Sequence, residues 1–227
     1  RAVIDAGIQA GARKVYLIEE PVAAALGAGL DLSVPRGRFI LDMGGGTTDI
    51  AVLSLNGIVC KKSIKLAGRK LDEAIVRCVR TDRNVLIGEK MAERIKIEVG
   101  SVFYTEDKEM EAKGRNLHTG LPEKFVIRTS DIYDALMEQV MQIVTAVQQI
   151  LEITPPELSA DIWEDGLIMT GGGAMLHGLG DLISQHAKIK VRLAEHPVEC
   201  VAIGTALSFS KLDELYDGFV TPSTHTH

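Results

Sequence analysis

The sequence predicts an α/β fold, in which strands and helices alternate along a chain of 227 residues. One observation is the segment 131–151, whose apolar residues recur at intervals of three and four, the spacing of an amphipathic helix. A second is a group of three β-rich runs at 39–42, 49–55 and 58–66. A third is the 22 glycines, several of which form two tight clusters where predicted strands end.

The composition is that of an ordinary globular protein. The chain has 25 Lys and Arg against 31 Asp and Glu, a formal charge of −6, and 46% of its residues are apolar. Nothing approaches the ~18 consecutive apolar residues of a membrane-spanning helix. The net acidity and the lack of any long Lys/Arg run argue against a nucleic-acid partner. Three well-separated cysteines favour a reducing, cytoplasmic location over a disulfide framework.

The N-terminal elements are short. A helix is expected over residues 2–10, ended by Gly11, and a strand over 14–18. Pro21 is a suitable first helical residue for a helix over 22–30. That helix is rich in alanine, which suggests close packing against a neighbouring element. Residues 31–38 are expected to form a linker.

The remaining elements follow the same alternation. The three β-rich runs are expected to be consecutive strands, with Asn56-Gly57 forming the hairpin turn between the second and third. The long helix begins after Ser130, a plausible N-cap, and ends at Pro155-Pro156. The other expected helices are 70–80, 87–99, 175–186 and 198–212, and the other expected strands are 108–113, 124–129, 167–170 and 189–193.

The first glycine cluster, residues 42–49, connects one predicted strand to the next. Its backbone N–H groups can form an anion-binding nest, because glycine leaves room for a phosphate to approach. Asp42, at the strand end, suits a hydrated Mg²⁺, which prefers one or two carboxylates and retained waters. The alternative is a β-hairpin with a simple Gly-Thr turn.

The second cluster, residues 170–174, joins a strand to a helix, so it favours an anion or a tight βα connection. Two such clusters, far apart in the sequence, can face each other across a cleft. Glu20 could orient a water for attack on a γ-phosphate, or it could be an ordinary acidic residue at a helix start. Neither cluster matches a P-loop or a Rossmann fingerprint.

Three motifs together are more specific. They are EEPVAAA at 19–25, DMGGGTTD at 42–49 and MTGGGA at 169–174. In this order and spacing they resemble the actin-like ATPase superfamily, which includes actin, chaperone ATPases and sugar kinases. Within it the chain is most similar to the bacterial cytoskeletal MreB/Mbl family, from about residue 1 to 212. Supporting stretches are GEKMAERIK at 88–96, GRNL at 114–117, PPEL at 155–158 and CVAIGT at 200–205.

The resemblance implies roles for the matching residues. Glu20 would position the hydrolytic water, and Asp42 would hold Mg²⁺ through water, so both would be catalytic and Asp42 would be the metal-binding residue. Gly204 would correspond to the second hinge connection between the halves of the fold. The implied ATP-binding residues are Gly44, Gly45, Gly46 and Thr47 at the phosphates, and Glu93, Arg94, Lys96, Gly171, Gly172, Gly173, Ala174 and Met175 around ribose and adenine.

The resemblance also implies an organisation into subdomains, within the second half of an actin-like (ribonuclease H-like) fold. Residues 1–33 would be a remnant of the first large subdomain. Residues 34–67 and 131–198 would form the second large subdomain, interrupted by a small subdomain at 68–130. Residues 199–227 would be a return helix and a disordered tail, of which 221–227 have no family match.

The implied function is that of a filament protein that binds and hydrolyses ATP with Mg²⁺ and maintains rod shape by organising cell-wall synthesis. Its partners would be further copies of itself and the wall-elongation machinery at the inner membrane face. Its location would be cytoplasmic, and membrane-associated at full length. Two alternatives stay open: a chaperone-type ATPase of the same superfamily, or a non-enzymatic assembly fragment.

The chain also departs from the family pattern. The family's first phosphate loop, most of its first large domain and its membrane-binding element have no counterpart in the sequence. We therefore expect a fragment that binds ATP weakly and is inactive alone, with membrane contact only through the missing elements. Arg69 and residues 178–180 differ from the commoner residues at those positions.

Overall fold

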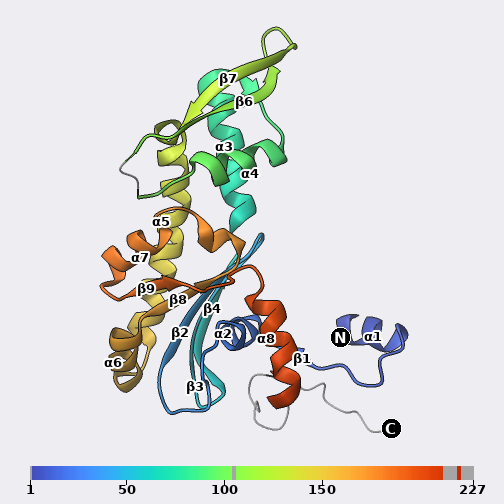
Figure 1. Cartoon of the computed structure of the whole chain (residues 1–227), viewed down its shortest axis with the longest axis vertical. Coiled ribbons are helices and arrows are strands. Elements are labelled where there is room, and N and C mark those ends of the chain that lie inside the picture. The colour runs from blue at the N-terminus through green and yellow to red at the C-terminus, as the bar shows by residue number, and fades with distance from the viewer. Residues whose placement is uncertain (1, 104–105, 212–218, 221–227) are drawn as a thin grey trace.

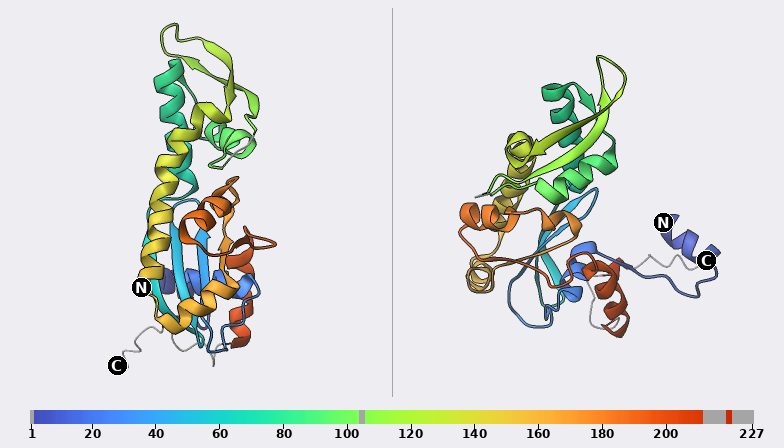
Figure 2. Two further views of the ribbon diagram at one scale, coloured as in Figure 1. Left: turned by 90° about the vertical axis from the view of Figure 1, so that its left-hand side faces the viewer. Right: turned by 45° about the horizontal axis from the view of Figure 1, so that its top comes forward.

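The computed structural model describes residues 2–103, 106–211 and 219–220. Two lobes are stacked along the long axis of the molecule (Figure 1). The lower lobe is built on a five-stranded sheet and the upper lobe on a three-stranded sheet. Helix α5 (Thr129–Ile153) runs from the upper lobe down along the lower one, and α3 (Gly68–Arg83) rises from the lower lobe into the upper one (Figures 1 and 2).

The five-stranded sheet contains the three consecutive strands that the sequence predicts. These strands, β2 (Arg38–Met43), β3 (Thr48–Ser54) and β4 (Gly57–Ile64), are antiparallel neighbours. On the other side of β2 lie β8 (Leu167–Thr170) and β9 (Val191–Leu193), which run parallel to it. Since β2 and β8 run parallel, their carboxyl ends meet, with Asp42 opposite Thr170. In order across the sheet, the strands are β4, β3, β2, β8 and β9.

Strand β2 is buried on both faces, as a central strand of an α/β sheet must be. Successive side chains point to opposite faces, so Leu41 joins the core that includes Ile143 of α5. Its neighbour Ile40 joins the opposite core, with Ala24 of α2 (Glu20–Gly27). The lower lobe is therefore layered, with helices covering both faces of the sheet.

The hairpin turn between β3 and β4 lies one residue earlier than the sequence predicts. Leu55 and Asn56 occupy the two central positions, with φ of 49° and 61°, and Gly57 already pairs with Ser54. Positive φ at both central residues is the geometry of a type I′ turn. The prediction of Asn56-Gly57 as the turn was wrong. Leucine rarely adopts positive φ, but the Asn56 N–H donates to the Leu32 carbonyl at 2.6 Å, a contact outside the hairpin that holds the turn at Leu55-Asn56.

The upper lobe packs two helices against its sheet. Strand β6 (Glu109–Asn116) directs alternate residues Met110 and Ala112 into a core that includes Ile95 of α4 (Glu89–Val99). Strands β6 and β7 (Pro122–Arg128) form an antiparallel pair, as predicted for the runs at 108–113 and 124–129. The elements besides α3 are β5 (Val85–Leu86), α4, β6 and β7.

Helix α5 begins earlier than predicted, and Ser130 is not its N-cap. The N-cap position is Arg128, whose backbone N–H donates to the Asp131 carboxylate at 2.8 Å. The Ser130 backbone N–H and hydroxyl instead donate to Asp107, at 2.8 and 2.9 Å. Strand β7 runs directly into the helix, so the residue that precedes the first turn is the last residue of the strand.

Other differences lie near the ends of elements. Helix α6 (Pro156–Asp165) is not predicted by the sequence, because two prolines can end a helix as well as suit the first turn of the next one. The helix expected over 175–186 is a 3₁₀ turn, η1 (Gly172–Met175), followed by α7 (Leu179–Ala187). The expected tail at 221–227 lies outside the described residues. The remaining elements are α1 (Ala2–Gln9), β1 (Leu17–Ile18), α8 (Cys200–Ser208), η2 (Phe209–Lys211) and β10 (Phe219–Val220).

The alanine-rich helix α2 packs against α8, which confirms the close packing expected from its small side chains. A Cβ placed on Gly204 would lie 1.7 Å from the carbonyl oxygen of Ala23. A Cβ on Gly27 would lie 1.8 Å from the carbonyl oxygen of Cys200. The two helices therefore pack antiparallel to each other, with their backbones in direct contact. In the described part of the chain, no helix is both long and apolar enough to cross a membrane.

Candidate functional site

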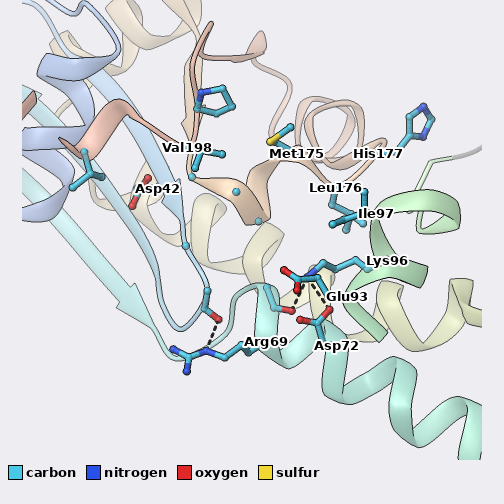
Figure 3. A pocket seen from close by; sticks show the side chains of 18 of the residues that line it. Asp42, Arg69, Asp72, Glu93, Lys96, Ile97, Met175, Leu176, His177 and Val198 are labelled. Atoms are coloured by element: carbon cyan, nitrogen blue, oxygen red, sulfur yellow. Dashed lines mark hydrogen bonds and ion pairs between the residues drawn. The ribbon is translucent and has the colours of Figure 1, made fainter. Parts of the chain in front are cut away.

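A cavity of about 740 Å³ opens between the carboxyl edge of the five-stranded sheet and helices α3 and α4. Figure 3 shows Asp42 on one side of it and a cluster of charged residues from α3 and α4 on the other. The sequence-predicted residues that line it are Glu20, Asp42, Gly44, Gly45, Glu93, Lys96, Gly171, Gly172, Gly173 and Met175. Segments separated by more than a hundred residues thus meet around one space.

Asp42 stands at the carboxyl end of β2 and is only 3% exposed. The Thr170 hydroxyl, at the end of β8, donates to its Oδ1 at 2.6 Å. Burial raises the pKa of the Asp42 carboxyl, and the hydrogen bond from Thr170 lowers it in part. One carboxylate oxygen is therefore held by the sheet, at a position that strand pairing fixes.

Glu20, the first residue of α2, is the second carboxylate at this end of the cavity. Its pKa is raised, first by loss of solvent around it and then by the negative charges of Asp42 and Asp49. Asp49 also contributes to the raised pKa of Asp42. Three acidic groups thus lie close together at this end of the cavity, a concentration of carboxyl groups that favours a cation. No group of three His, Cys, Asp or Glu side chains among the described residues could hold a metal ion directly.

The first glycine turn is anchored to the start of α3. Gly44 N–H donates to Thr47 O at 3.1 Å and closes the turn. The first backbone N–H groups of α3, at Gly68 and Arg69, donate to the carbonyls of Gly44 and Gly45 at 3.1 and 2.9 Å. These bonds satisfy two donors that a helix start leaves unpaired, and they fix the turn against the cavity wall.

The second glycine turn lies against the first. Gly171 has φ of +85°, and a Cβ there would lie 2.3 Å from the carbonyl oxygen of Met43. A Cβ on Gly173 would lie 3.0 Å from the carbonyl oxygen of Gly44. Only glycine permits both this backbone conformation and this approach. The two clusters therefore form one continuous backbone surface at the cavity.

Helix α4 supplies a charged wall opposite the sheet. Lys96 forms an ion pair with Asp72 of α3 at 2.8 Å, and the two side chains are 13% and 12% exposed. The Lys96 ammonium also donates to the Gly68 carbonyl at 3.2 Å. Burial raises the pKa of Asp72, and Lys96 opposes that shift. The sequence alone did not single out Asp72, because an acidic residue at helical spacing looks like any solvated one.

The cavity also has apolar walls. Ile97, Val198 and Met175 are 72%, 66% and 57% exposed, and all three line the cavity. Figure 3 shows Met175 and Val198 on one side and Ile97 on the other. Exposed apolar side chains that face one another across a space form a slot suited to a flat, apolar ligand surface.

Four predicted site residues do not line the cavity. Arg94 and Lys96 are two residues apart in α4, so their side chains leave the helix on different sides. The Arg94 guanidinium lies on the exposed face, where it donates to the Glu98 carboxylate at 2.6 Å. Ala174 is buried within η1. Gly46 and Thr47 lie at the tip of the first turn, beside the cavity rather than on its lining.

A contact between the lobes involves His177, a residue of the cavity lining. Ser101, after α4, is hydrogen-bonded through Oγ to His177 Nδ1 at 2.9 Å, and Val102 N–H donates to the His177 carbonyl at 3.0 Å. His177 follows η1 and lines the cavity. A Cβ on the next residue, Gly178, would lie 2.6 Å from the backbone nitrogen of Phe103. The two loops can therefore meet only where this glycine stands.

We expect Gly178→Ala to destabilise the chain by about 1–3 kcal/mol, because φ of +81° strains alanine and its methyl group meets the Phe103 backbone. Thermal unfolding followed by circular dichroism measures the loss. Gly120→Ala is the matched control, since φ there is +73° with no atom within 4 Å. Equal losses in both variants would show that backbone strain alone is responsible and that the contact between the lobes contributes nothing.

The same architecture occurs in solved structures. The chain superposes with a TM-score of 0.89 on the crystal structure of MreB 5 of Spiroplasma citri bound to AMPPNP, at 35% identity, covering 93% of this chain and 64% of that one. It superposes with a TM-score of 0.69 on the MamK double helical filament, at 22% identity, covering 85% of this chain and 58% of that one. These likenesses define the fold as actin-like.

The sequence places the chain more narrowly. Residues 1–217 match the MreB/Mbl protein family. The chain is 45% identical over 216 residues to the cell shape-determining protein Mbl of Bacillus subtilis (strain 168), and 46% identical over 214 residues to the cell shape-determining protein MreB of Escherichia coli (strain K12). It therefore belongs to the MreB/Mbl family. The match to Mbl covers 95% of this chain and 65% of the relative, and the match to MreB covers 94% of this chain and 62% of the relative. The chain therefore spans less than two thirds of the length of each.

Proposed function

We propose that the cavity binds ATP. The observation that carries the proposal is the pair of glycine turns in backbone contact, with the buried Asp42 carboxylate at their junction. Such turns accept phosphate groups, and the apolar slot around Met175 suits an adenine ring. Two MreB structures of similar fold contain AMPPNP and ADP. The chaperone-type alternative is disfavoured by the family match.

We propose that Asp42 holds Mg²⁺ through water molecules. The acidic groups at this end of the cavity fit such an ion, because Mg²⁺ keeps several waters and needs only one or two carboxylates plus phosphate oxygens. The bound ion would neutralise phosphate charge.

We propose that Glu20 orients the water that attacks the γ-phosphate. Its position at the cavity edge and its raised pKa, caused by loss of solvent and by Asp42 and Asp49, are typical of a group that handles a proton. Gly44, Gly45, Gly46 and Thr47 would hold phosphate oxygens. Glu93, Lys96 and the second glycine turn would surround the ribose and adenine.

We propose for the complete protein the family's role in cell shape: filaments of further copies, formed in the cytoplasm and at the membrane, that organise wall synthesis. Both relatives compared above are named cell shape-determining proteins. The proposal includes the subdomain organisation of the family. The second large subdomain would be 34–67 with 131–198, the small subdomain 68–130, and the flanking segments 1–33 and 199–227. The non-enzymatic assembly fragment is the competing proposal, and it predicts no nucleotide binding.

Titration of the chain with Mg-ATP in a calorimeter tests the site. We expect weak binding, with no sub-micromolar dissociation constant, because the first phosphate loop of the family has no counterpart in this sequence. Gly172→Val should abolish the binding, since its side chain would extend toward Val198, 3.9 Å from the Cβ position, and fill the slot.

The control is Gly88→Val, at a glycine outside the cavity with no atom within 4 Å of its Cβ position. It should leave the binding heat unchanged. If both valine variants bind as wild type does, or if Gly88→Val loses the binding heat as Gly172→Val does, the cavity is not the ATP site.

A further inference from the structure

A second hollow lies on the other side of α3, between β4, α3 and α5. Its volume is about 530 Å³, and four cations line it: Lys62 and Lys65 from β4 and the loop that follows, and Lys70 and Arg77 from α3. We call it the basic groove. Lys70 and Arg77, about two turns apart on one side of α3, line this groove, whereas Arg69 and Asp72 line the first cavity. The two hollows therefore use different faces of one helix.

The charge of the basic groove is largely uncompensated. Glu73 is shared by Lys70 at 2.6 Å and Arg77 at 4.0 Å. Lys62 donates to the neutral amide of Gln149. Among the described residues, neither Lys62 nor Lys65 forms an ion pair, and no acidic side chain lines the groove. A concentration of positive charge on a chain of net charge −6 marks a surface that attracts an anionic partner.

The opposite wall of the basic groove is a row of amides. Gln139, Gln142 and Gln149 project from α5 at helical spacing, and the amide oxygen of Gln149 already accepts from Lys62. Such amides can pair with both the N–H and the C=O of a peptide backbone. Ile64 and Leu66 add apolar surface at the edge.

We propose that the basic groove binds an extended acidic peptide segment of a partner protein. Carboxylates would meet the cations, the backbone would meet the glutamines, and an aliphatic side chain would cover Ile64. No aromatic residue lines the groove to stack on a base, which disfavours single-stranded nucleic acid. A single arginine offers no paired guanidinium clamp for a free phosphate. The proposal does not depend on ATP binding.

Fluorescence anisotropy with a short labelled peptide of glutamates and leucines, at low ionic strength, tests the proposal. We expect wild type to bind, and the pair Lys62→Glu with Lys65→Glu to weaken binding at least about tenfold. The matched control is Lys108→Glu with Lys113→Glu, which changes net charge equally at exposed positions of the upper lobe. It should stay within about twofold of wild type.

A gain-of-binding variant excludes misfolding as the cause. Gln142→Lys adds a cation to the exposed amide row, so it should tighten peptide binding and steepen its salt dependence. Gly172→Val should leave peptide binding unchanged, which separates this proposal from the ATP site. The proposal is overturned if wild type does not bind the peptide, if the control pair weakens binding equally, or if a thymidine oligonucleotide or inorganic phosphate displaces the peptide at equal concentration.

Discussion

Gly204→Val should lower the free energy of unfolding by about 3 kcal/mol or more. A Cβ at this position would lie 1.7 Å from the Ala23 carbonyl oxygen, so α2 and α8 must separate to admit the side chain. The obstacle is backbone, which has no alternative rotamer. Intrinsic helix propensity predicts the reverse effect, because valine is a better helix former than glycine. A net loss therefore reports the helix contact alone.

Urea unfolding followed by circular dichroism measures this loss. Ala206→Val is the control, since Ala206 is exposed on the same helix and the change should move stability by only a few tenths of a kcal/mol. Gly27→Val should reproduce the loss, because its Cβ would lie 1.8 Å from the Cys200 carbonyl oxygen. If Gly204→Val unfolds at the same urea concentration as Ala206→Val, the two helices do not pack in this way.

Periodicity and turn residues predicted most of the lower lobe. The β-rich runs and the glycine cluster between the first two located β2, β3 and β4, and the strand predicted over 167–170 coincides with β8. One error falls where a contact distant in sequence outweighs the local preference. Asn56-Gly57 is the better turn locally, because leucine rarely adopts positive φ, yet the Asn56 N–H donates to the Leu32 carbonyl and the turn forms at Leu55-Asn56. Another falls at Pro156, since proline can end one helix or begin the next.

The site was only partly visible in the sequence, because its walls come from distant segments. Glycine clusters and strand-end acids carry a local signal, so Asp42 and both turns were found. The Lys96–Asp72 pair and the exposed Val198 have no such signal, since their roles depend on how α3, α4 and η1 are placed. Arg94 shows the converse. It belongs to a family motif, yet its side chain pairs with Glu98, away from the cavity.

Asp42→Asn should leave the fold intact and raise its stability at neutral pH. Burial raises the pKa of Asp42 above its ordinary value of 3.8, so the folded chain holds this proton more tightly than the unfolded chain does. The stability that comes from this proton is fully present below pH 3.8 and is lost as pH rises through the raised, folded-state pKa. Asparagine removes the buried charge and still accepts from Thr170. The gain over wild type in thermal unfolding should therefore shrink as the pH is lowered.

The same substitution should nevertheless abolish Mg²⁺-dependent ATP hydrolysis by the complete protein, with a loss of about 10²-fold or more. A neutral amide cannot attract a hydrated cation as a carboxylate does, so higher Mg²⁺ should restore the rate only in part. Phosphate release at several Mg²⁺ concentrations gives the result. Higher stability together with lost activity is typical of a group retained for function at the expense of the fold. If the variant instead hydrolyses ATP at the wild-type rate with the same Mg²⁺ dependence, Asp42 is a turn residue and holds no metal.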